Sequence, residues 1–228
     1  MSKVKINQKE MMEAGMHLGH RTSKLHPHME SFVVGIRNTV HVIDLEKTQK
    51  CLEKALEVIA KIIANKGTIL FVGAKTPLKK LVQRTAEECN MPYVVERWLG
   101  GTFSNFNVIH KRAQYYANLK EQKAKGELVK YTKKERIKIE KDFGKLATKF
   151  EGIVNLAELP EAVFIVDIVK DKLALKEAGM KHVKTIAIVD SNADPALVDY
   201  PIPANDDAIS SVKYILDKVK ETILQNKS

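Results

Sequence analysis

Short apolar runs recur along the chain and predict the strands of a sheet. They are rich in Val, Ile and Phe and lack the alternation of a strand that has one face in water. Strands of this kind are covered on both faces, as in a parallel sheet. The runs are TILFVG (68–73), PYVV (92–95), AVFIVD (162–167) and TIAIVD (185–190), and DYPIP (199–203) is expected to form a short last strand.

Segments with a helical spacing of apolar positions lie between or beside these runs. Three begin at typical helix-start signals, namely Asp44, Thr76 before Pro77, and Asn205 before two aspartates. The alternation of strands and helices predicts a doubly wound α/β fold, with a mainly parallel sheet flanked by helices. The expected helices span 44–65, 77–90, 170–179 and 206–224.

Residues 104–150 follow another pattern, which predicts a helical hairpin inserted between the second and third strands. Apolar positions step by three or four residues from Phe106 to Tyr116, and again from Ile139 to Ile153. We expect two antiparallel helices that pair as a coiled coil. The α/β core domain would then consist of residues 1–103 and 151–228.

The ends of these two helices also carry recognisable signals. Gly126 can end the first helix, and Thr132 with Glu135 forms a T-x-x-E capping box that would start the second. The break falls in KAKGELVKYT, residues 123–132. Arms of about 20 residues would extend for about 30 Å.

Positive charge is concentrated on this hairpin. The 228 residues carry a formal net charge of +10, and residues 104–150 hold 13 Lys or Arg against 5 Asp or Glu. A solvated coiled-coil strut is one explanation of such lysines, but it needs no excess of one sign, whereas a surface that faces phosphates does. The predominance of Lys over Arg suits contact with phosphates better than bidentate reading of base edges.

Composition narrows the class of protein. With 44% hydrophobic and 29% charged residues, the chain can bury a core and is not disordered in bulk. No window approaches the roughly 20 apolar residues of a membrane span, and no export segment is visible. Its two cysteines, Cys51 and Cys89, lie in expected helices, so a disulfide framework is not predicted and a cytoplasmic location is expected.

Signatures of catalysis are missing from the expected loops. AKTPLKK, which follows the first strand, matches neither the P-loop nor the G-x-G-x-x-G pattern. No Ser-His-Asp or Cys-His arrangement with a supporting signature is visible. DSNADP (190–195) and NDDA (205–208) are explained as Asx turns and as a helix start. We expect no enzyme and no small-molecule substrate, although a nucleotide- or metal-dependent α/β enzyme is kept as an alternative, as is a protein-interaction scaffold.

An amino-terminal cluster of histidines raises the question of a structural metal site. MHLGHRTSKLHPHM (16–29) places four imidazoles close together, so they could surround a structural zinc ion. Arg21 and Lys24 would repel a cation, however, and no cysteine joins the set. We therefore expect no cofactor and interpret the imidazoles as donors to backbone or to RNA. The zinc candidates are His17, His20, His26 and His28.

Several motifs resemble a known family. In order and at compatible spacing, they cover the chain from about residue 7 to residue 224. The motifs are AGMHLGHRTSKLHPHM, IRNTVHVIDLEKT, GTILFVGAK, RWLGGTFSNF, and VDSNADP followed by IPANDDA. They are similar to the bacterial small-subunit ribosomal protein two family.

The resemblance implies a structural protein of the small ribosomal subunit. Members of that family have an α/β domain with a projecting coiled-coil hairpin, bind ribosomal RNA on the solvent side and are not enzymes. The resemblance also implies neighbouring small-subunit proteins as partners, including the largest one, which helps to capture messenger RNA.

The stretch RWLGGTFSNF (97–106) lies where the chain would turn into the hairpin. Gly100 and Gly101 can end the strand extension, and Trp98 is interpreted as a buried plug between hairpin and sheet, with base stacking as the alternative. For RNA contacts we predict residues of the amino-terminal loops, the junction and the hairpin. They are His17, His20, Arg21, Lys24, Arg37, Arg97, Asn105, Lys111, Arg112, Lys133, Lys134 and Arg136.

Overall fold

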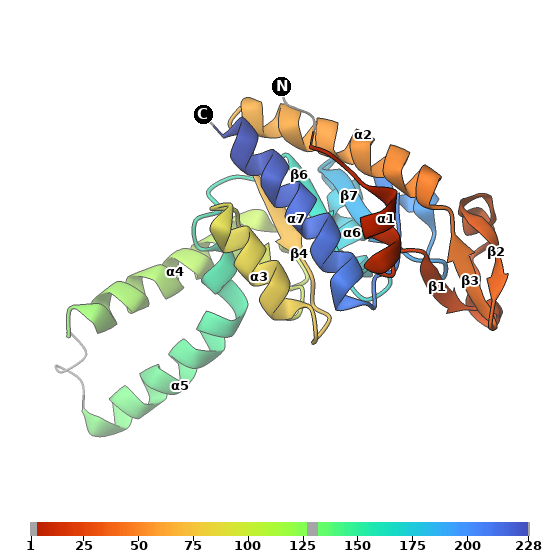
Figure 1. The fold of residues 1–228 in the computed structure, drawn as a ribbon. Coiled ribbons are helices and arrows are strands. Elements are labelled where there is room, and N and C mark those ends of the chain that lie inside the picture. Colours follow the sequence, from red (N-terminus) through yellow and green to blue (C-terminus); the bar gives the residue numbers. More distant parts are fainter. Residues whose placement is uncertain (1–3, 127–131, 228) are drawn as a thin grey trace.

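Five parallel strands form the centre of the structure, a computed structural model that describes residues 4–126 and 132–227 (Figure 1). Their order is β5-β4-β6-β7-β8, and every neighbouring pair is parallel. The predicted apolar runs all form strands, so the α/β class and the parallel sheet are confirmed. The strands are β4 (Ile69–Val72), β5 (Tyr93–Val94), β6 (Ala162–Ile165), β7 (Lys184–Val189) and β8 (Tyr200–Pro203).

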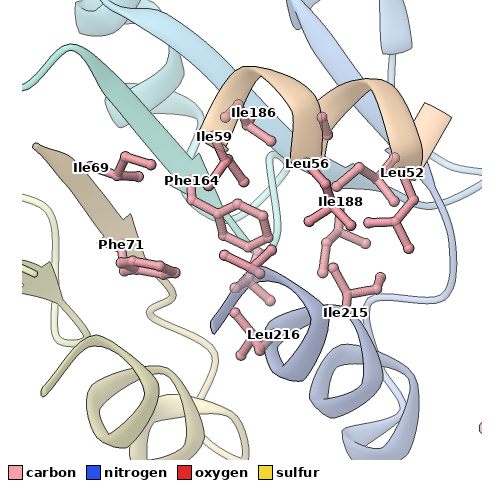
Figure 2. Packing of buried hydrophobic residues seen from close by; sticks show 14 of the residues in the cluster. Leu52, Leu56, Ile59, Ile69, Phe71, Phe164, Ile186, Ile188, Ile215 and Leu216 are labelled. Carbon is pink, nitrogen blue, oxygen red and sulfur yellow. The ribbon is translucent and has the colours of Figure 1, made fainter. Parts of the chain in front are cut away.

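Both faces of this sheet are covered, because successive side chains of a strand point to opposite sides. Ile69 and Phe71 of β4 enter one core with three helices, as Figure 2 shows for two of these helices. Leu70 and Val72 enter a second core with α6 and the bases of α4 and α5. The helices of the first face are α2 (Leu45–Ala64), α3 (Lys79–Glu88) and α7 (Ile209–Asn226), and α6 spans Lys172–Met180.

The predicted helix starts have different outcomes. Asp44 caps α2, because its side chain accepts from two N–H groups of the first turn. Thr76 is not a cap: it lies in a turn, and α3 begins after Leu78. Asn205 does not cap α7 either, since its side chain accepts from the N–H groups of residues 207 and 208 and so forms a turn before the helix.

A second, antiparallel sheet was not predicted from the sequence. It has the order β1-β3-β2 and consists of β1 (Leu18–Arg21), β2 (Val33–Arg37) and β3 (Val40–Ile43). Asn38 and Thr39 join β2 to β3 with positive φ at both positions, as in a type I′ hairpin. The sequence signal that could have predicted this hairpin is the pair of β-branched runs on either side of Asn38 and Thr39. The short segments nearby are α1 (Gln8–Glu13), η1 (Thr22–Lys24) and η2 (Pro27–Phe32).

Helices α4 (Phe106–Ala124) and α5 (Lys133–Phe150) connect β5 to β6 and project from the sheet, away from the antiparallel sheet (Figure 1). The predicted ends are confirmed: Gly126 follows α4 with φ of +71°, and Thr132 and Glu135 form a capping box. The connection 127–131, within the predicted break, lies outside the described residues. Coiled-coil packing along the arms stays a prediction.

The remaining short helices are η4 (Glu151–Ile153), where the chain re-enters the body, and η5 (Pro195–Leu197). Within 4–126 and 132–227, no helix has both the length and the apolar composition needed to cross a bilayer.

Candidate nucleic-acid interface

One buried carboxylate holds the loop between β5 and α4. Glu177 of α6 is 4% exposed and accepts hydrogen bonds from the backbone N–H groups of Gly101, Phe103 and Ser104 at 2.7, 2.8 and 3.2 Å. Hydrogen bonds to a carboxylate are stronger than neutral ones and offset the cost of burying its charge. Gly101 permits this turn because its φ of +94° favours glycine. The start of α4 is thereby tied to α6.

Trp98 lies in the apolar junction beside this loop. It is 4% exposed and packs edge to face against Phe103, with ring centroids 5.0 Å apart. Val72 of the sheet and Tyr116 of α4 belong to the same core. The interpretation of Trp98 as a plug is therefore confirmed, and its ring is too buried to stack on a base.

Further contacts anchor the base of the hairpin. A Cβ atom added to Gly152 would lie 2.1 Å from the backbone oxygen of Tyr93, so only glycine lets η4 approach β5 so closely. Between the two helices, the rings of Tyr116 and Phe143 are 5.2 Å apart. Because the Gly152 contact involves the sheet itself, it helps to define the direction in which α4 and α5 leave the sheet.

Four of the predicted cations lie on the exposed surface of this hairpin. Lys111 and Arg112 are on α4, and Lys134 and Arg136 are on α5. None of them forms an ion pair with a described residue. The side chain of Lys133, the remaining predicted hairpin cation, lies outside the described residues. These four charges are therefore available to an external anion.

A half-open hollow of about 260 Å³ lies where α4, α5 and the junction loop meet. Asn105 is exposed at its edge and makes no side-chain bond to the first turn of α4. Arg112 and Lys149 also line the hollow, and no Asp or Glu does. Arg97 is exposed in the adjacent loop. The sequence did not single out Lys149, although it lies in the last turn of the second basic helix.

The predicted amino-terminal residues surround the antiparallel sheet instead. Arg21, Lys24 and Arg37 are exposed, whereas His17 is half-buried, and burial and the nearby Arg37 charge lower its pKa. This sheet and the hairpin are at opposite ends of the structure (Figure 1). The fold thus brings the predicted residues together as two groups rather than one.

His20 is placed differently from the other predicted residues. Its Nδ1 lies 3.2 Å from Asp190, and its Nε2 lies 3.5 Å from Asp207. The hydrogen bond with Asp190 raises its pKa. His20 therefore joins the amino-terminal sheet to the carboxyl ends of β7 and β8 by contacts within the protein.

The same sheet edge contains an ion network that sequence analysis missed. The ammonium of Lys75, after β4, lies 3.2 Å from Asp167, 2.8 Å from Asp206 and 2.7 Å from Asp207. Doubly wound folds commonly bind ligands at this edge, where the strand order reverses. Here a lysine of the chain occupies it. The sequence signal that could have predicted this network is that Lys75 and its aspartate partners each follow the end of a parallel strand.

Burial and mutual repulsion alter the protonation of this network. Burial, together with the charges of Asp167 and Asp190, raises the pKa of Asp206 to about 7. The Lys75 hydrogen bond lowers the pKa of the more exposed Asp207. Nearby, burial raises the pKa of Asp171 to about 6, although its carboxylate accepts a hydrogen bond from the N–H of Ala74. Because Lys75 brings one positive charge to three aspartates, partial protonation of Asp206 near neutral pH reduces the excess of negative charge.

The zinc candidates do not form one group. Among the described residues, the sets of side chains near enough to share an ion are His20 with Asp190 and Asp207, and His26 with His28 and Asp194. His17 belongs to neither set. In the second set, His26 Nδ1 accepts from the N–H of His28, which favours the tautomer whose Nε2 carries a proton. Hydrogen bonds within the chain thus engage one ring nitrogen of His26 and one of His28, whose Nδ1 lies 2.8 Å from Asp194.

Comparison with known proteins identifies the family. The family model described as ribosomal protein S2 matches residues 11–226. A small ribosomal subunit protein uS2 from Dehalococcoides mccartyi is 38% identical over 219 residues, which are 96% of this chain and 89% of that protein. Another protein of the same name, from Roseiflexus castenholzii, is 40% identical over 223 residues, 98% of this chain and 85% of that protein. The chain belongs to the ribosomal protein S2 family, whose members are structural and non-enzymatic components of the small ribosomal subunit.

Proposed function

We propose that the protein binds ribosomal RNA of the small subunit, mainly through phosphates, and thereby supports translation. The observation that carries the proposal is the set of exposed, unpaired cations on α4 and α5 within the described residues. Lys and Arg supply most contacts that position proteins on nucleic-acid backbones. Family membership makes RNA the polyanion expected at such a surface.

The proposal assigns different roles to two parts of the chain. Residues 104–150 act as a basic insertion, and residues 1–103 with 151–228 act as the core that holds it. The Glu177 contacts and the close approach of Gly152 to Tyr93 support this division, because they attach the two ends of the insertion to α6 and to β5 of the core. A rigid attachment lets a hairpin match the shape of a folded RNA.

Arg21, Lys24 and Arg37 are proposed to form a second RNA contact at the opposite end. Their exposure supports this assignment. Contacts with neighbouring small-subunit proteins, including the largest one, and a cytoplasmic location belong to the same proposal. We propose no cofactor.

The proposal is tested by the salt dependence of binding to purified small-subunit ribosomal RNA. With about six phosphates neutralised, affinity should fall about a thousandfold between 50 and 200 mM salt, because binding releases counterions. Replacing Lys134 and Arg136 by Gln should weaken binding and reduce the slope by about two. Affinity independent of salt would contradict the proposal. Saturable thermal stabilisation by a divalent metal ion would instead favour the enzyme alternative.

A further inference from the structure

We propose that the hollow at the base of the hairpin binds one unpaired nucleotide of RNA, with its phosphate between Arg112 and Lys149 and its base on an apolar wall. This inference rests on the proposed RNA-binding function and adds a specific site to it. The residues that carry it are Leu99, Asn105, Val108, Ile109, Arg112 and Lys149, all of which line the hollow.

The charge of the hollow fits a phosphate. Arg112 and Lys149 are exposed, come from different helices and form no ion pair with a described residue. Glu177, a carboxylate of the junction, is buried and already accepts three backbone hydrogen bonds. Two cations without acidic neighbours in the lining favour a monovalent or divalent anion.

The wall of the hollow fits a base rather than a bare anion. Leu99 and Val108 supply most of the apolar surface, since Ile109 is only 9% exposed, whereas Val108 is 46% exposed although it lies in the first turns of a helix that packs on the core. An unpaired base offers a flat apolar face to such a surface. The bases of a duplex keep these faces stacked, so the site should select unpaired RNA.

Gly100 contributes no side chain to the lining of the hollow. It lines the hollow, and a Cβ atom built on it meets no heavy atom closer than 3.9 Å, from Leu173. Its backbone is not in the left-handed region, so a side chain fits without strain. Asn105, with a free amide at the edge, can donate to a base or to the phosphate.

The first experiment compares two double variants of the full chain in binding to small-subunit ribosomal RNA. Arg112→Gln with Lys149→Gln should weaken affinity at least tenfold and make the salt dependence shallower by one to two units of slope. Lys50→Gln with Lys213→Gln removes the same charge from exposed positions on α2 and α7, which cover the other face of the sheet. This control should stay within about twofold of the unaltered chain.

The second experiment separates the base from the phosphate. In methyl-labelled protein, uridine monophosphate should shift the signals of Leu99, Val108 and Ile109, whereas inorganic phosphate should leave them nearly unchanged. Gly100→Leu adds an uncharged side chain at the lining of the hollow, so it should weaken or abolish these shifts. It should also weaken RNA binding while the salt slope is kept.

Other results of these two experiments would contradict the nucleotide site, the proposed RNA-binding function, or both. Equal affinities of the two double variants, equal shifts with inorganic phosphate, or unaltered binding by Gly100→Leu would remove the nucleotide site and leave the proposed function intact. If the Arg112 and Lys149 variant lost a neighbouring subunit protein instead of RNA, the hollow would be a protein contact. Absence of RNA binding by the unaltered chain would overturn both proposals.

Discussion

The backbone N–H of Gly101 lies 2.7 Å from a carboxylate oxygen of Glu177, which is 76 residues further along the chain. Two more N–H groups of the same loop point to this carboxylate. The orientation of the basic hairpin therefore depends on a charge buried against the core. The only tryptophan of the chain, Trp98, lies beside the loop and can report its state by fluorescence.

Glu177→Gln keeps the shape of this side chain but places an amide NH₂ group where backbone donors converge. We expect the free energy of unfolding to fall by about 2 kcal/mol, because hydrogen bonds to a charged group are lost and a buried donor is left unpaired. Urea unfolding followed by Trp98 fluorescence measures this change. Glu13→Gln, at an exposed position, should change stability by less than about 0.5 kcal/mol. Equal stability of the two variants would show that the loop does not depend on the carboxylate.

Gly152→Ala and Gly144→Ala should have opposite effects. At residue 152 the new methyl group would overlap the Tyr93 backbone, and we expect a loss of about 3 kcal/mol. At residue 144, inside α5, no heavy atom lies within 4 Å of the built Cβ, so higher helix propensity should stabilise the protein by about 0.5–1 kcal/mol. Thermal unfolding of both variants tests this, and a tolerated Gly152→Ala would mean that η4 does not need this close approach.

Lys75→Met removes the cation that three aspartates share. Leaving buried carboxylates without their partner should cost about 3–5 kcal/mol of stability, more than the loss of an exposed lysine. Lys80→Met, on the surface of α3, is the matched control and should be nearly neutral. Urea unfolding at neutral pH measures both. A small effect at Lys75 would indicate that the network rearranges or takes up protons when the lysine is lost.

Asp171 should make stability depend on pH in a defined window. Its pKa is raised to about 6 in the folded protein from an ordinary value of 3.8, so the folded state holds a proton that the unfolded state has released. Stability should therefore fall as the pH rises from about 4 to 6, at a rate of up to about 1.4 kcal/mol per pH unit from this group.

Asp171→Asn removes this dependence while its side-chain oxygen can still accept from Ala74. The stability of the variant relative to the unaltered chain should increase across the same window, as measured by urea unfolding at several pH values. Asp142→Asn controls for the loss of a surface charge. Parallel pH profiles for the Asp171 variant and the unaltered chain would refute the assignment.

Much of the architecture could be predicted because it depends on local patterns. Strands buried on both faces must be apolar throughout, so the runs from 68–73 to 185–190 were recognisable without knowledge of their partners. The capping box of Thr132 and Glu135 is equally local, since its hydrogen bonds span three residues. The excess of positive charge on residues 104–150 needs only counting.

Tertiary structure alone decided which distant groups meet. Nothing near Glu177 marks it as the acceptor for a loop 76 residues away, and the positions of Lys75 and Asp206 after parallel strands do not by themselves pair these two residues. It also decided where α3 and α7 begin. Thr76 and Asn205 resemble helix caps in the sequence, but each lies in a turn before its helix.

The sequence by itself thus determined the strands and helices of the α/β core and the hairpin, their order and the sign of the charge, because period, capping and composition act over a few residues. The fold decided that the predicted cations form two separate groups, that His20 contacts carboxylates of its own chain, and that a hollow opens beside Arg112 and Lys149. Such relationships depend on how the sheet orders its strands and on which side chains it buries together. A pattern along the chain carries no direct record of either.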